Sequence, residues 1–265
     1  MRSIMLAASL ALAPVIPAFA DSPEVPNDWP PLVRQALTAA HDGGEDDVWR
    51  FTLRADYGDA GEFTARFDST LPEGEQWTLI SPASASAMSA ELRDQWNDLS
   101  TPDEDEAEAP AEGEDAEEET GQSFGIGGDG SGLFFSADTA DLISGEVREL
   151  RRSGGRAVFA FAPNMSDGED DAEADAFGEH LSGELTVSEG DAFVERIRIY
   201  APASFKPHPI ARVHAFEMVM DFAREDGLPG PIVRNFSTQI DISAMFQRQS
   251  QDISFTFSDV EYEAR

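Results

Sequence analysis

Alternating apolar and polar residues recur along most of the chain, with the two-residue period of strands that bury one face. The pattern is clearest at 212–222, where His214, Phe216, Met218, Met220 and Phe222 fall on the same face. Short polar turns separate the alternating runs, and no helix-length crossover lies between the C-terminal ones, which favours antiparallel pairing. The runs are 48–57, 62–67, 77–80, 145–151, 155–163, 181–187, 192–200, 212–222, 232–242 and 252–262.

Two segments have the apolar spacing of helices instead. Residues 28–40 begin with prolines that suit a first helical turn, and residues 84–99 place Met88, Leu92 and Trp96 on one stripe. These three residues are candidates for a helical lid over the sheet. The predicted fold class is therefore mainly β (α+β): a single curved antiparallel sheet or half-barrel with an N-terminal helix and an inserted amphipathic helix.

The apolar strand faces supply the candidate ligand-binding residues. Phe and Met together form an adaptable apolar wall, so these faces could line a cavity, although an ordinary sheet core has the same pattern. His214 shares a face with this set and is interpreted as a packed or rim residue rather than a catalytic one. The ligand-cavity candidates are Phe216, Met218, Met220, Phe222, Phe236, Phe255 and Phe257.

The first twenty residues have the pattern of a secretory signal peptide. Arg2 precedes an apolar stretch at 4–16, and small residues at Ala18 and Ala20 predict cleavage between Ala20 and Asp21. The apolar stretch is shorter than the roughly 20 residues that a spanning helix needs. We therefore expect an exported chain with no membrane span after cleavage, periplasmic in a Gram-negative bacterium and otherwise secreted.

Charge is concentrated in two segments. Acidic residues outnumber basic ones 52 to 18, a net charge of −34, which excludes binding to nucleic acid or an anionic membrane by bulk electrostatics. An acidic tract followed by a glycine-rich stretch predicts a disordered insertion at 100–132, and a second acidic tract predicts a mobile loop at 166–177. Residues 21–99 and 133–265 are then two parts of one sheet domain.

No motif in the sequence carries catalytic chemistry in its proper context. Gly121–Gly125 matches the Gly-x-Ser-x-Gly pattern around Ser123, but no strand and helix flank it, as a nucleophile elbow requires. The four histidines have no metal-ligand spacing, and cysteine is absent. We predict neither an enzyme, nor a cofactor, nor a metal site.

The order of these elements resembles that of the periplasmic lipoprotein carriers, the LolA/LolB-like group. The resemblance rests on layout and on the strand sequence at 181–187, and covers 28–67 and 180–262. It implies a curved sheet around an apolar cavity that accepts acyl chains. The predicted function is a non-enzymatic periplasmic binding protein for a lipid or other apolar ligand. The alternative is an envelope interaction or sensor protein that engages a basic protein partner through its acidic insertion.

Overall fold

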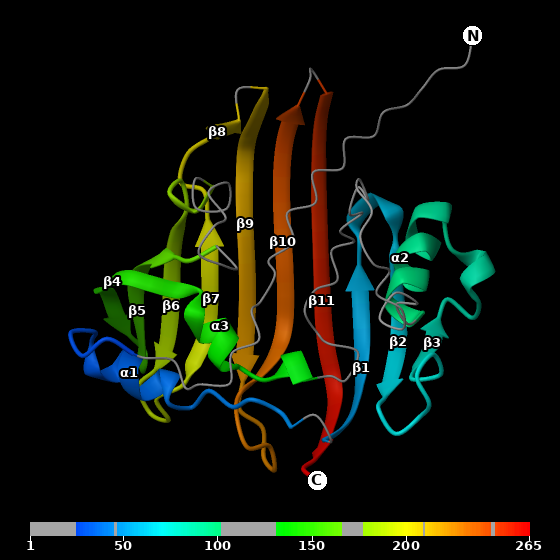
Figure 1. Ribbon diagram of the computed structural model, residues 1–265, viewed down its shortest axis with the longest axis horizontal. Helices are drawn as coiled ribbons and strands as arrows, with labels where there is room; N and C mark the ends of the chain where they lie inside the picture. The colour runs from blue at the N-terminus through cyan, green and yellow to red at the C-terminus, as the bar shows by residue number, and fades with distance from the viewer. Residues whose placement is uncertain (1–24, 45–46, 102–130, 166–176, 209, 245–246) are drawn as a thin grey trace, which may run out of the picture.

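One large antiparallel sheet organises the protein (Figure 1). The computed structural model describes residues 25–44, 47–101, 131–165, 177–208, 210–244 and 247–265. The predicted cleavage site at Ala20 and Asp21, Ser123, and most of both acidic segments lie outside these residues. Within them, the mainly β fold is confirmed, because the sheet is curved and unclosed and the helices are few and short.

Ten strands in the described parts of the chain follow the predicted runs closely, with longer C-terminal members, and the short β8 lies where no strand was predicted. The strands are β1 (Val48–Asp56), β2 (Glu62–Asp68), β3 (Trp77–Ser81), β4 (Ile143–Ser153), β5 (Arg156–Pro163), β6 (Ser182–Ser188), β7 (Val194–Tyr200), β8 (Phe205–His208), β9 (Ala211–Ala223), β10 (Ile232–Ala244) and β11 (Gln247–Glu263). The helices are α1 (Pro31–Leu37), α2 (Ala90–Ser100) and α3 (Ala137–Asp141), and the single 3-10 turns are η1 (Gly58–Ala60), η2 (Ala85–Ala87) and η4 (Ser131–Leu133).

The first and last strands of the chain pair in the middle of the sheet. Its order is β3-β2-β1-β11-β10-β9-β7-β6-β5-β4, with β8 paired to β9 outside this path. The last strand, β11, lies antiparallel between β10 and β1. The N-terminal hairpin thus extends the sheet beyond its C-terminal strand, whereas the remaining strands follow one another as a meander.

Most of the long strands present one apolar and one polar face, and these apolar faces are in register across the sheet. Phe51 of β1 lies opposite Phe67 of β2, and Phe236 of β10 lies opposite both Met220 of β9 and Phe255 of β11. Ile197 of β7 continues the same row beside Met220. Because side chains alternate along every strand, this register gathers the apolar residues on one side of the sheet.

The helices lie on that apolar side. In Figure 1, α1 and α3 lie in front of the left half of the sheet, and α2 lies at its right end. Helix α1 buries Val33, Ala36 and Leu37, and its first position is the proline that the sequence suggested. Helix α2 begins after Ser89, whose side-chain oxygen accepts a hydrogen bond from the backbone N–H of Leu92 at 3.1 Å.

Two sequence predictions are corrected in detail. Met88 does not lie in the amphipathic helix, because its extended backbone ends η2 and the helix begins two residues later. A β-bulge in β9 interrupts the alternation at His214: Val213 lies opposite Ile242, but Ala215 lies opposite Asp241. The extra residue moves His214 away from the face of Phe216, and its ring nitrogen Nε2 lies 2.9 Å from the Ser243 hydroxyl.

Candidate functional site

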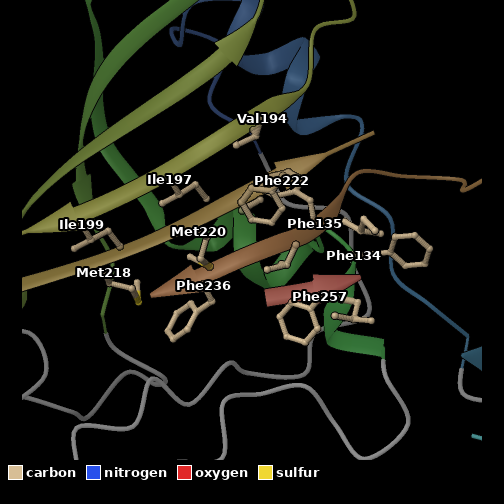
Figure 2. Packing of buried hydrophobic residues seen from close by; sticks show 14 of the residues in the cluster. Phe134, Phe135, Val194, Ile197, Ile199, Met218, Met220, Phe222, Phe236 and Phe257 are labelled. Atoms are coloured by element: carbon tan, nitrogen blue, oxygen red, sulfur yellow. The ribbon is translucent and has the colours of Figure 1, made fainter. Parts of the chain in front are cut away.

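The predicted ligand-binding residues come together on the apolar side of three neighbouring strands. Strand β9 supplies four of them, β10 one and β11 two, and their cross-strand register makes them a continuous surface, labelled in part in Figure 2. We call this set the aromatic wall: Phe216, Met218, Met220, Phe222, Phe236, Phe255 and Phe257.

Six of the seven wall residues are buried, and Phe255 is partly exposed. The rings of Phe236 and Phe255 stack with centroids 6.0 Å apart, and Phe257 meets Phe51 of β1 at 5.8 Å with nearly perpendicular rings. Phe222 packs edge-on against Phe135 at 5.2 Å. These ring geometries are the favoured ones for aromatic pairs, so the wall is well ordered as an apolar surface.

The apolar face continues past the wall toward the paired ends of β10 and β11 at Ala244 and Gln247. Ile240 lies opposite Phe216, and Ile242 lies opposite Val213 on the same face. Ile253 of β11 lies opposite Thr238 two residues before Phe255. All three isoleucines remain partly exposed, in contrast to the buried wall residues beside them.

The predicted lid residues cover a different part of the sheet. Trp96 of α2 packs on Phe63 of β2 with ring centroids 5.5 Å apart, and Leu92 lies against Gly61 at the start of β2. Met88, Leu92 and Trp96 are all buried there. Trp96 and Leu92 therefore lie against β2 at one end of the sheet rather than against the wall on β9 to β11, and the role of the three residues as a lid remains a prediction.

Sequence reasoning missed the residues that cover the wall itself. Phe177 packs on Phe216 and Phe205 at one end, with ring centroids 5.4 and 5.2 Å away. At the other end Leu133, Phe134 and Phe135 are fully buried. Their signal in the sequence is a run of three large apolar residues after the glycine-rich stretch, which is too short for an element of its own.

A polar group of residues lies beside Phe134. The Tyr262 hydroxyl donates to Asp47 Oδ2 at 2.6 Å, and the other oxygen of this carboxylate accepts the backbone N–H of Arg265 at 3.1 Å. The Tyr262 hydrogen bond lowers the pKa of Asp47, so this carboxylate is charged at neutral pH. Burial, and then the same hydrogen bond, raise the pKa of Tyr262 to about 12.

The opposite face of the sheet is polar and carries cross-strand ion pairs. Arg196 pairs with Asp221, and Arg198 lies between Glu184 and Glu217. Arg50 bonds Asp68 at 3.0 Å between β1 and β2. Exposed pairs of this kind stabilise a fold by only about 0–1 kcal/mol each, and their main consequence is that this face is solvated. The apolar face is therefore the one suited to hold a ligand.

No group of three or more His, Asp or Glu side chains in the described parts of the chain is arranged to hold a metal ion. Among the same residues, no helix has the length and apolar character needed to cross a membrane.

Comparison with known proteins adds no relative. The chain matches no family model, no curated protein and no solved structure.

Proposed function

We propose that this protein is a non-enzymatic binding protein that holds an acyl chain or another apolar ligand against the apolar face of its open sheet. The observation that carries the proposal is the extension of the buried aromatic wall into the partly exposed Ile240, Ile242 and Ile253. This apolar row continues from a buried core into solvent. Covering its exposed part with an apolar ligand is therefore favourable in free energy.

The chemistry of the wall supports binding rather than catalysis. Its side chains are aromatic rings and thioethers, which pack against hydrocarbon but do not transfer protons or act as nucleophiles. Each methylene of a ligand that becomes buried contributes about 0.8 kcal/mol. Five buried methylenes thus contribute about 4 kcal/mol before the free energy lost on association is subtracted.

The layout supports the same class of ligand. An unclosed antiparallel sheet with short helices on its apolar side is what the resemblance to periplasmic lipoprotein carriers leads one to expect. The signal-like first twenty residues support export, which in a Gram-negative bacterium would place the protein where such carriers act.

The test compares two substitutions on neighbouring residues of β10. Ile240→Asn changes the apolar face, and Gln239→Asn puts the same residue on the exposed polar face. Each variant is titrated with a fluorescent fatty acid and with its methyl ester, and the purified protein is examined by native mass spectrometry for retained lipid. We expect Ile240→Asn to weaken binding about tenfold, which corresponds to roughly 1.4 kcal/mol, and Gln239→Asn to leave it unchanged.

Urea unfolding of both variants serves as the folding control. The proposal is refuted if neither probe binds the unmodified protein and no lipid is retained. It is equally refuted if the two substitutions weaken binding to the same extent, because binding would then not depend on the apolar face.

A further inference from the structure

Phe134 is the centre of an aromatic cluster at one end of the apolar face. This end lies beside Ile232 at the start of β10, away from the paired residues Ala244 and Gln247. The Phe134 ring meets His41 edge-on at 4.6 Å, Trp49 at 4.7 Å and Tyr262 at 5.1 Å. The cluster adjoins the aromatic wall, because Phe135 packs on Phe222 (Figure 2). A ligand lying along the wall would therefore end near Phe134.

Two buried nitrogen atoms in this cluster have no hydrogen-bond partner. They are the indole Nε1 of Trp49, a residue with 1% of its surface exposed, and Nε2 of His41. Buried N–H groups in folded proteins are nearly always paired, since an unpaired one loses the hydrogen bonds that it made to water. Both atoms belong to rings that contact Phe134, which leaves them available to a polar group from outside the protein.

The neighbouring polar groups of the protein are already engaged. The Tyr262 hydroxyl donates a hydrogen bond to Asp47. Asp47 in turn accepts backbone N–H groups of Gly44 and Arg265, at 2.6 and 3.1 Å. None of these groups bonds Trp49 Nε1, and an indole N–H is a donor only, so an acceptor brought by a ligand would pair it.

The negative charge near this cluster favours an uncharged acceptor over a carboxylate. Asp47 is ionised and interacts with His41, and the whole chain carries a charge of −34. A second carboxylate brought against His41 and Trp49 would be repelled by this charge. An uncharged oxygen meets no such repulsion, and a hydroxyl can accept from the indole while it bonds the imidazole in either tautomer.

We propose that Trp49 Nε1 and His41 Nε2 bind the uncharged polar end, a hydroxyl or an ester carbonyl, of an acyl ligand that lies on the apolar face. This inference rests on the proposed function and specifies which ligands the site prefers. The Phe134 ring contacts the rings of both residues, and its segment is held by an isolated bridge to Ile232 of β10. Because both nitrogens are buried, binding of the polar end requires side chains of this cluster to move.

The test uses three ten-carbon probes, 1-decanol, decanoate and decane, with the full chain. The four indole N–H signals are followed by ¹⁵N NMR, and that of Trp49 is assigned from its loss in Trp49→Phe. We expect 1-decanol to shift this signal, decane to leave it in place, and decanoate to bind more weakly than 1-decanol. Trp49→Phe should weaken 1-decanol binding about fivefold, the effect of one lost neutral hydrogen bond, without changing decane binding.

Trp77→Phe is the matched control, because Trp77 packs on Phe51 and Phe67 outside this cluster. The inference is overturned if 1-decanol and decane bind equally well and Trp49→Phe affects neither, since the two nitrogens would then serve only an internal water. If Ile240→Asn still weakens both probes in that case, the proposed function survives. If no probe binds, both fail together.

Discussion

A glycine on β6 offers the sharpest test of the packing that shapes the apolar face. Gly183 lies directly opposite Phe161 of β5, whose ring covers it. A Cβ atom at position 183 would lie only 2.3 Å from Cζ of Phe161, and 2.4 and 2.5 Å from two more ring carbons. Ordinary carbon contacts are about 3.5–4.0 Å, so in Gly183→Ala the ring must move by more than about 1 Å.

The ring has little room to move, because Phe161 is 5% exposed within the core. Overpacking of this kind costs about 1–3 kcal/mol, and in a chain of this size each kcal/mol lowers the Tm by about 2–4 °C. Backbone strain does not enter, since Gly183 has no positive φ. The free energy of unfolding is measured by urea denaturation, and the Tm by circular dichroism.

Two further variants separate overpacking from other effects. Gly190→Ala is the control, because no atom lies within 4 Å of its added Cβ, and we expect a change within about 0.5 kcal/mol. Combining Gly183→Ala with Phe161→Leu should recover part of the loss, with a coupling of about 0.5–3 kcal/mol between the two sites. If Gly183→Ala is as stable as Gly190→Ala, the ring does not pack on this glycine and the argument is wrong.

Two other predictions concern the cap of α2 and two partly buried tyrosines. Ser89→Ala removes the acceptor for Leu92 N–H and the 3.0 Å hydrogen bond to Ala60 O. It should lower the free energy of unfolding, measured with urea, by about 1 kcal/mol. An unchanged value would contradict the capping role of Ser89. The pKa values of Tyr57 and Tyr262 are both raised from 10.0 to about 12, chiefly by burial. Because the folded state holds these two protons more tightly than the unfolded state, the stability that the tyrosines contribute is complete below pH 10 and is lost as pH rises toward 12. The double variant Tyr57→Phe, Tyr262→Phe should lose less stability than the unmodified protein between these pH values. With one lysine in the chain, few other groups titrate there, and equal losses would refute the assignment.

The two-residue period of the sequence was sufficient to predict ten of the strands in the described residues, but not the short β8. The run at 212–222 shows where the alternating pattern predicts the buried face correctly and where it does not. Phe216, Met218, Met220 and Phe222 share the buried face as the alternation predicts. His214 does not, because a bulge inserts one residue in β9, and a single sequence contains no signal for such a change of register.

Pairing between distant strands could not be read from the same pattern. Alternation states which face of a strand is apolar, but not which strand lies beside it. Thus β11 fits between β10 and β1, and no turn connects β11 to β1 to mark their contact. The cluster of His41, Trp49 and Phe134 depends on this arrangement, because its members come from three separate segments of the chain.

The position of β11 has a consequence for how the candidate site is built. Leu53 of β1 lies opposite Phe257, and Ala55 lies opposite Phe255, so the last strand joins the aromatic wall to the part of the sheet that α2 covers. Tyr262, near the end of the same strand, lies opposite Trp49 and bonds Asp47. The apolar face and the polar end proposed for it therefore both require the final strand to pair with the first. Neither half of the chain holds the site alone, which is why local patterns indicated its components but not their assembly.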